Sequence, residues 1–255
     1  MSTSASPPIR TSASVPILFR APVFTREAAS LFRRRRTYVM QLCFLGGLFV
    51  ALMLLWPHGT VDAAGRGRDC FKLFAALELA VAGLLAPALA APAIATEREK
   101  ETLGLLAIAG ASPHRILAGK ALGRLAQVVV LIAISLPLVS ALFVVGGLSP
   151  GEVGPVFVEA IALGALGVGL GSFFSATTRR PETATVYAFL SIIAIAGVPE
   201  GLARAGLGLP AYHLSPTTWY EALFNPLAMT GETTFRAWYV APLLHVALGA
   251  AALVA

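Results

Sequence analysis

The sequence predicts an all-α polytopic integral membrane protein, and its composition and apolar segments support this. Of its 255 residues, 57% are hydrophobic and only 13% are charged, and the mean hydropathy is +0.78. Soluble domains are rarely so apolar. A bilayer core of about 30 Å requires about 20 apolar residues per helix. Apolar segments that we interpret as about six membrane spans lie near residues 38–56, 73–95, 121–145, 156–176, 183–198 and 238–255.

The amino-terminal region differs from the rest of the chain. Residues 1–20 are rich in Ser, Pro and Ala and lack the apolar core of a signal peptide, which predicts a disordered tail. Residues 21–255 are predicted to form one transmembrane domain. Within residues 22–36, apolar side chains recur at helical spacing ahead of four arginines. This pattern predicts an amphipathic helix at the membrane interface, and the equally weighted alternative is a simple basic anchor.

Basic residues are distributed unequally between the two sides of the predicted bundle. Short cytoplasmic loops are enriched in Lys and Arg. We therefore expect the amino terminus to be cytoplasmic and the protein to lie in a bacterial-type inner membrane. The residues that set this orientation are Arg33–Arg36, Arg98, Lys100, Arg115, Lys120, Arg124, Arg179 and Arg180. Since this bias accounts for most of the net charge of +6, we expect no nucleic-acid partner.

The segment between the second and third spans is the most informative part of the sequence. The second span is predicted to end at about Thr96, and a charged turn follows. Ser112 suits a helix N-cap and Pro113 the first helical position, so a new helix should begin there. A solvated loop is the alternative, but the apolar side chains beside the charges favour a docking surface. Its predicted residues are Glu97, Arg98, Glu99, Lys100, Glu101, Thr102, Leu103 and Leu106.

Two further predictions concern the fifth apolar segment and the region that follows it. The fifth segment is short and runs into Pro199, so a broken or re-entrant helix is an alternative to a full span. After it, Pro216 and Pro226 delimit a short helix with aromatic pairs at i, i+4 spacing. We expect an outer gate or, with equal weight, an interfacial anchor. Its residues are Trp219, Tyr220, Leu223 and Phe224.

Several residues inside the apolar segments predict packing rather than chemistry. The Gly167–Gly171 spacing favours close helix contact inside the bundle over a dimer contact. His245 is predicted to find a hydrogen-bond partner on another helix. Glu78 and Glu159 are placed within a turn or two of the outer ends, where they would snorkel or pair.

No motif in the sequence predicts catalysis. A Gly-x-x-x-x-Gly-Lys-Ser/Thr loop, a His-Glu-x-x-His motif and a Gly-x-Ser-x-Gly motif are all missing from it. Cys43 and Cys70 form no plausible disulfide or metal set. We therefore expect no catalytic residues, no cofactor and no metal site.

Taken together, short motifs in one order along the chain resemble the permease subunits of type-2 ATP-binding-cassette (ABC) exporters. The matching segments are Pro22-Val-Phe-Thr-Arg-Glu27, Ile94-Ala-Thr-Glu-Arg-Glu-Lys-Glu-Thr-Leu103, Ile116-Leu-Ala-Gly-Lys120, Gly171-Ser-Phe-Phe-Ser-Ala-Thr-Thr-Arg179 and Ser215-Pro-Thr-Thr-Trp219 with Asn225-Pro226. The resemblance implies an interfacial elbow helix, six spans and a coupling helix between the second and third spans. It also implies a permease dimer that works with two separate ATPase subunits.

Three points stay open on this resemblance. Family members generally continue into a charged tail, so a truncated gene product is an alternative to a complete sixth span. Lipid, polysaccharide, drug, peptide and cofactor exporters share these features, so the substrate is undetermined. The alternative functions are a non-transporting membrane scaffold or assembly subunit and, third, a membrane-embedded enzyme.

Overall fold

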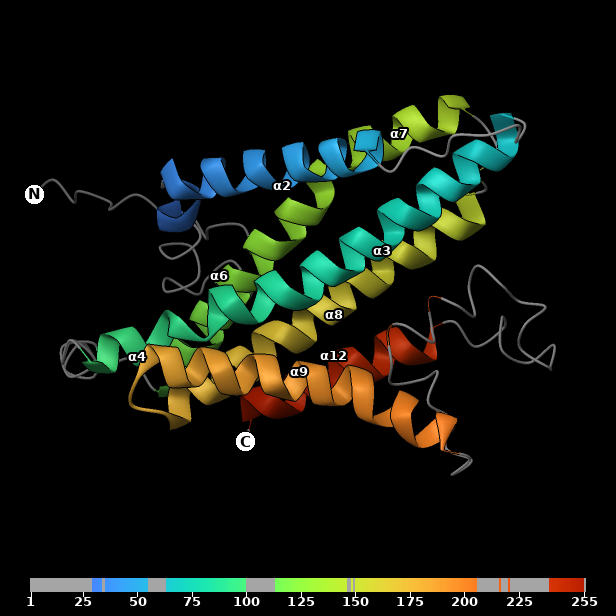
Figure 1. The fold of residues 1–255 in the computed structure, drawn as a ribbon. Helices are drawn as coiled ribbons and strands as arrows, with labels where there is room; N and C mark the ends of the chain where they lie inside the picture. The colour runs from blue at the N-terminus through green and yellow to red at the C-terminus, as the bar shows by residue number, and fades with distance from the viewer. Residues whose placement is uncertain are drawn as a thin grey trace, which may run out of the picture.

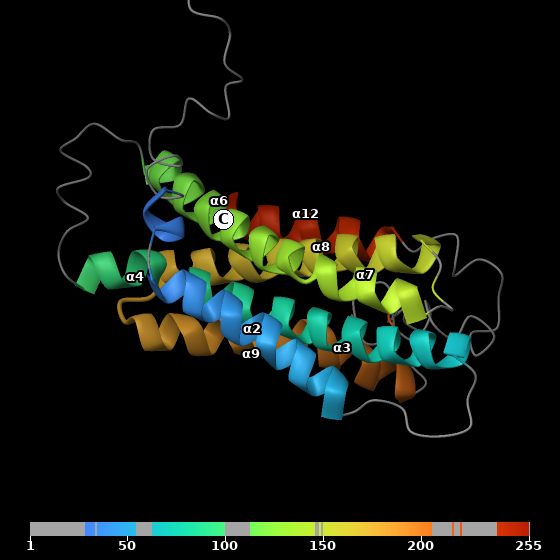
Figure 2. The ribbon, with the colours of Figure 1, turned by 90° about the horizontal axis from the view of Figure 1, so that it is seen from above.

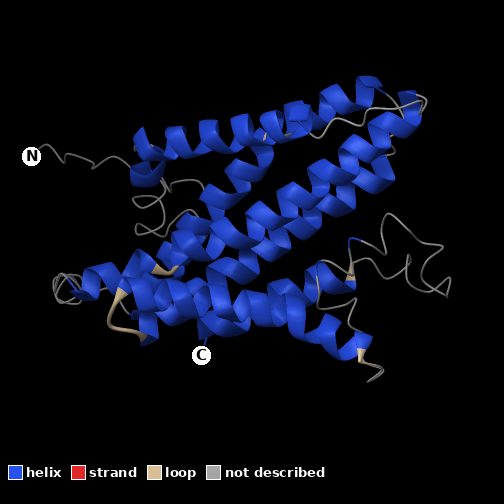
Figure 3. Cartoon of the chain, in the orientation of Figure 1, coloured by secondary structure: helices blue, strands red, loops and turns tan. Residues whose placement is uncertain are grey.

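The computed structural model describes residues 29–33, 35–54, 63–99, 113–145, 148, 150–205, 216, 220 and 239–254. In this part of the chain the regular structure is helical throughout, and Figure 3 shows no strand there. The helices are α2 (Arg35–Leu54), α3 (Ala63–Ala90), α4 (Pro92–Glu99), α6 (Pro113–Ile134), α7 (Leu136–Val145), α8 (Pro150–Thr177), α9 (Pro181–Arg204) and α12 (Val240–Val254). The all-α prediction is confirmed.

The helices run back and forth along one bundle axis (Figure 1). Helix α4 continues α3 after a bend at Ala91, and α7 continues α6 after a bend at Ser135. The start of α2, the end of α4, the start of α6, the end of α8 and the end of α12 lie at one end of the bundle, which we call the α4 end. This alternation is the arrangement that a polytopic membrane protein requires.

Five helical paths are long and apolar enough to cross a membrane. They are Arg35–Leu54, Gly67–Glu99, Ile116–Val144, Pro150–Thr177 and Pro181–Val198. Helix α12 is apolar but has only 15 residues, so it is about 22 Å long. The described residues thus give five candidate spans and one shorter apolar helix where the sequence predicts about six spans.

Helix α8 is the centre of the bundle, and its glycines allow α3, α6 and α12 to approach closely. A Cβ atom on Gly167 would lie 2.8 Å from Ala86 and Pro87 of α3, and one on Gly171 would lie 2.9 Å from Ala90. A Cβ on Gly169 would overlap the backbone of Gly249 in α12. The prediction that the Gly167–Gly171 spacing serves packing within the chain is therefore confirmed. Figure 2 shows α8 between α12 and the α3 side of the bundle.

Two sequence-based expectations about helix ends differ from the structure. The second span continues through α4 to Glu99 instead of ending near Thr96. Helix α9 passes through Pro199 without interruption, so the broken-helix alternative is excluded. One proline removes only one backbone hydrogen bond, which a helix packed against neighbours tolerates.

The two intramembrane glutamates also lie deeper than predicted. Helices α3 and α8 begin at Ala63 and Pro150, several residues before the expected starts of these spans. The side chains of Glu78 and Glu159 are therefore buried, with 1% and 0% of their surface exposed. Snorkelling to the membrane surface is excluded, and both carboxyl groups find partners inside the bundle.

Candidate functional site

The bend between α3 and α4 is stabilised by a serine from another helix. Pro92 has no N–H group, and the first turn of a helix leaves its remaining N–H groups without partners in that helix. The backbone N–H groups of Ile94 and Ala95 donate to the Ser175 Oγ of α8, at 2.9 and 3.0 Å. Ser175 is fully buried. It acts as an N-cap supplied by a residue about 80 positions away, and so ties α4 to α8.

The charged end of α4 makes a second contact with α8. The Arg98 guanidinium donates to the carbonyl oxygens of Ala176 (2.5 Å) and Thr178 (3.0 Å). The last carbonyls of a helix lack partners in that helix and carry partial negative charge, so a cation is favourable there. Arg98 therefore closes the end of α8 while it holds the end of α4.

A third contact ties α4 to α6. The Lys120 Nζ donates to the Glu97 Oε1 at 2.7 Å. Lys120 is only 7% exposed, and an ammonium group at such a position needs a charged or polar partner. We call Ser175, Arg98, Glu97 and Lys120 together the α4 clamp.

Helix α9 covers the remaining side of α4. Ala91 and Ala95 pack against Ala184 and Ala188 of α9, with Phe174 beside them. Small side chains at such a contact let the two backbones approach closely. Helix α4 is thus held by α6, α8 and α9.

The predicted docking residues are only partly described by the structure. Glu97, Arg98 and Glu99 lie on the last turn of a helix, not in a charged turn. Glu97 and Arg98 engage other helices of the same chain, whereas Glu99 is exposed. The other residues of the predicted surface, Lys100, Glu101, Thr102, Leu103 and Leu106, lie outside the described residues. Helix α6 begins at Pro113, as predicted.

The opposite end of the bundle carries one residue of the predicted gate or anchor. The Tyr220 hydroxyl donates to the Lys72 carbonyl oxygen at 2.8 Å. Burial, reinforced by the negative charge of Asp69, raises the pKa of Tyr220, so its hydroxyl remains a donor at neutral pH. Arg68 of α3 pairs with Glu152 of α8 at 2.8 Å nearby. Trp219, Leu223 and Phe224 lie outside the described residues.

Tyr220 and Pro216 also border an apolar cavity of about 480 Å³ between α3 and α9. Its other lining residues include Leu79, Gly83 and Ile193. A cavity of this size falls within the range of small-molecule sites. One predicted gate residue therefore lies directly beside an apolar space in the bundle.

The family follows from a sequence comparison that covers most of this architecture. Residues 74–255 match the family described as ABC-2 family transporter protein. The chain belongs to the ABC-2 transporter family. The resemblance to type-2 ABC permeases is thereby confirmed, and an ABC-2 chain is a membrane component of an ABC transporter that generally works with an ABC ATPase subunit. No curated protein matches the sequence.

Two polar contacts in this ABC-2 chain are buried at the depth of the spans. His245 of α12 meets Glu159 of α8, which confirms that His245 finds a partner on another helix. At the α6–α7 bend, the Ser135 Oγ lies 3.1 Å from the Glu78 Oε1 and 2.7 Å from the Ile132 carbonyl oxygen. Among the described residues, no three His, Cys, Asp or Glu side chains form a group that could hold a metal ion.

Sequence reasoning missed the most important member of the α4 clamp in this ABC-2 chain. In the sequence, Ser175 belongs to the Gly171–Arg179 segment that resembles the family, and no capping role was predicted for it. A weak signal was present, because Pro92 creates a helix start whose N–H groups need acceptors. The rotation of α8 about its axis, which directs Ser175 towards α4, cannot be predicted from the local sequence.

Proposed function

We propose that this chain is the permease subunit of an ABC exporter and forms the substrate path with a second permease, either another copy of itself or a homologue. In this proposal, a separate ATPase subunit drives it through the region from Glu97 to Lys120. The α4 clamp is the observation that carries this proposal. The clamp joins the charged end of α4 to α6 and α8 by contacts of 2.5–3.0 Å. A partner bound at this end could therefore move several spans at once.

The transmission follows the packing. Arg98 and Ser175 link α4 to α8, and α8 packs on α3 through Gly167 and Gly171. The bend at Ala91 places α4 at an angle to α3. In the proposed mechanism, a displacement of α4 would therefore also move α3 and α8. In the proposed cycle, closure of the ATPase subunits tilts these spans and switches access between the two faces.

The distribution of charge supports a cytoplasmic α4 end, and with it a cytoplasmic amino terminus in a bacterial-type inner membrane. The basic residues with described side chains at this end are Arg33, Arg35, Arg36, Arg98, Lys120, Arg124, Arg179 and Arg180. At the opposite end, Arg68 and Lys72 pair with Glu152 and Asp69. Among the described side chains, the excess of positive charge thus lies at the α4 end, as the positive-inside rule requires of a cytoplasmic face.

Tyr220 supports the proposed outer gate. It lies beside the 480 Å³ cavity and is fixed to α3 by its bond to Lys72. We extend the gate to Phe224, four residues after Tyr220, and to the i, i+4 pair Trp219 and Leu223 on the adjacent stripe. In this proposal, the aromatic residues close the outer mouth of the path.

Charge reversal at Glu99 tests the coupling surface. Glu99 is exposed and makes no ion pair in the described structure, so Glu99→Lys should leave stability within about 0.5 kcal/mol of the wild type. If the surface binds an ATPase subunit, reversal should weaken co-purification of that subunit and lower transport together. Glu182→Lys is the matched control, because Glu182 is an exposed acid at the start of α9, at the same end of the bundle.

The outcomes separate the proposal from its alternative. Normal co-purification and normal transport in Glu99→Lys would remove the role of this surface in coupling. An ATPase subunit that binds the wild type without any ATP-dependent transport in proteoliposomes would favour the scaffold function. Glu97→Lys is a poor test, because it would also remove the partner of the largely buried Lys120.

A further inference from the structure

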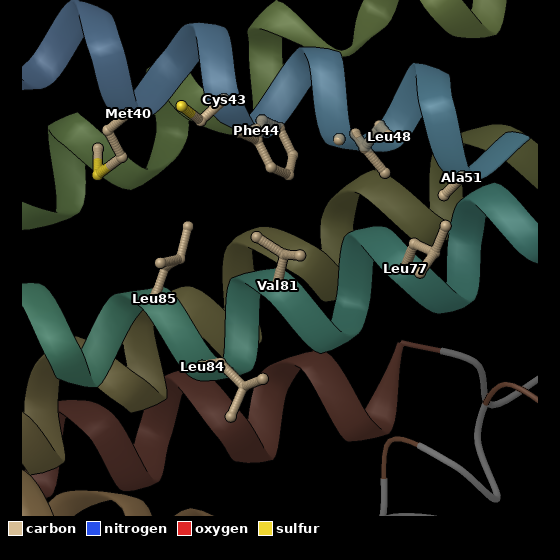
Figure 4. Close-up of a pocket in the computed structure, with 10 residues that line it drawn as sticks. Met40, Cys43, Phe44, Leu48, Ala51, Leu77, Val81, Leu84 and Leu85 are labelled. Carbon is tan, nitrogen blue, oxygen red and sulfur yellow. The ribbon is translucent and has the colours of Figure 1, made fainter.

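An apolar groove runs along the bundle between α2 and α3. It has a volume of about 400 Å³, and its α2 side includes Met40, Phe44, Gly47 and Leu48. Figure 4 shows the side chains of Met40, Phe44 and Leu48 directed towards α3, and those of Val81 and Leu85 of α3 directed back towards α2. Every one of these side chains is apolar. Within the hydrocarbon core of a membrane, such a space must be filled by apolar groups, because water would find no hydrogen-bond partner in it.

The groove is open at Gly47, where α2 is loosely packed against its neighbours. A Cβ atom built on Gly47 would meet no other atom within 4 Å, and the same holds for Gly46. Only Gly47 of this pair lines the groove. Phe44 and Leu48 are buried and form its floor, whereas neighbouring Leu42 is 73% exposed.

The stripe of α2 that faces the groove ends in a positive charge. Arg36 precedes Met40 by four residues, so it continues the stripe formed by Met40, Phe44 and Gly47 by one helical turn. Its side chain is exposed, as are those of Arg33 and Arg35. Helix α2 contains no acidic residue, and α3 and α4 contain none between Glu78 and Glu97. No carboxylate therefore neutralises these arginines from the two helices that form the groove.

The length of the groove matches one leaflet. From Met40 to Ala51 the helix rises about 16 Å at 1.5 Å per residue. Half of a hydrocarbon core of about 30 Å is about 15 Å. The groove thus begins one turn beyond Arg36, and its length along α2 is close to the depth that one acyl chain reaches.

We propose that this groove is a binding site for one anionic phospholipid of the leaflet at the α4 end. Its acyl chain lies along Phe44, Gly47 and Val81, and its headgroup phosphate accepts hydrogen bonds from Arg36 and its neighbours Arg33 and Arg35. Guanidinium groups bind phosphate through two parallel hydrogen bonds, which favours arginine at such a position. A zwitterionic lipid offers the same acyl chain without the net negative charge, so the arginines select the anionic headgroup.

Native mass spectrometry of the purified full chain tests the site. The protein would be incubated with equal amounts of phosphatidylglycerol and phosphatidylcholine that carry identical acyl chains. We expect preferential retention of phosphatidylglycerol. Gly47→Phe fills the groove without meeting a described atom at its Cβ and should lower this retention about tenfold, a change of about 1.4 kcal/mol. Gly46→Phe, one residue away and outside the lining, should retain phosphatidylglycerol as the wild type does.

A second pair of measurements separates headgroup from acyl-chain binding. Changing Arg33, Arg35 and Arg36 to Gln should equalise the two lipids while some lipid remains bound. In the unmodified chain, Cys43 lines the groove and Cys70 is buried, so a thiol reagent in detergent should label Cys43. Phosphatidylglycerol should slow this labelling more than phosphatidylcholine does.

Three results would overturn the proposal. Equal retention of both lipids by the wild type would show that the site does not discriminate between lipids by headgroup charge. Unchanged retention in Gly47→Phe would place the lipid elsewhere. A Cys43–Cys43 cross-link between two copies in membranes, with no lipid protection of Cys43, would show that a second copy occupies this face.

Discussion

The His245 Nδ1 lies 2.8 Å from the Glu159 Oε1, and neither side chain exposes any surface. This contact joins α12 to α8 in the interior of the bundle. Helix α12 has only 15 residues and is shorter than a typical span. We infer that its position depends on contacts with α8, of which this polar pair and the approach of Gly169 to Gly249 are the most specific.

His245→Ala should destabilise the protein by about 3–5 kcal/mol, because it leaves Glu159 buried without this contact. The measurement is the thermal unfolding of the purified protein in detergent. Glu159→Gln should cost less, since the amide oxygen still accepts a hydrogen bond from the imidazole. His114→Ala is the control, because His114 is exposed on α6. Equal unfolding temperatures for His245→Ala and the wild type would show that the pair does not hold α12.

Gly169→Ala should cost about 1–3 kcal/mol by overpacking, because the new methyl group overlaps the Gly249 backbone. Gly154→Ala lies in the same helix and meets no atom within 4 Å. Alanine is the better helix former by about 1 kcal/mol, so this control should be neutral or stabilising. Unfolding of the two variants in detergent gives the comparison. If both variants behaved alike, close approach of α12 to α8 would be wrong.

Ser175→Ala should cost about 1–3 kcal/mol, because the buried N–H groups of Ile94 and Ala95 lose their acceptor. Under the proposed function, it should also reduce ATP-driven transport per folded molecule. Ser191→Ala is a suitable control, since the Ser191 hydroxyl donates to the Tyr187 carbonyl oxygen of its own helix and does not connect two helices. Transport and stability are measured on the same preparations. Loss of stability with normal transport per folded molecule would confine Ser175 to a structural role.

Tyr220→Phe should cost about 0.5–1.5 kcal/mol at neutral pH, because it removes the hydrogen bond to the Lys72 carbonyl. The sign of the pH dependence follows from the raised pKa of Tyr220, which burial and the charge of Asp69 cause. The protonated hydroxyl is the form that the fold favours. Its contribution is therefore complete below the pKa of an unfolded tyrosine, about 10, and is lost as the pH rises through the higher folded value.

Unfolding of the wild type and Tyr220→Phe between pH 7 and pH 11 checks this dependence. The difference between their free energies of unfolding should be constant up to about pH 9. It should shrink as the pH rises above the pKa of an unfolded tyrosine, about 10. Tyr187→Phe serves as the control on α9, where the tyrosine is half exposed to the surroundings. A difference that grows with pH would contradict the assigned hydrogen bond.

Local and periodic features of the sequence were sufficient for the fold class. The all-α class, the helix start at Pro113 and the close-packing glycines of α8 were predicted correctly. Each depends on residues within a few turns of one another, so that hydropathy, capping preference and spacing carry the information. The family resemblance was also readable, since it depended on the order of short motifs.

Tertiary structure decided how the helices meet and therefore what the polar residues do. Arg98 looked like part of an exposed docking surface, yet it closes the end of α8 about 80 residues away. Glu159 looked like a residue near a membrane surface, yet it lies buried against His245. In both cases the partner is fixed by the tilt and rotation of α8 relative to α4 and α12. Those quantities arise from the packing of all the spans together, and no local pattern in the chain encodes them.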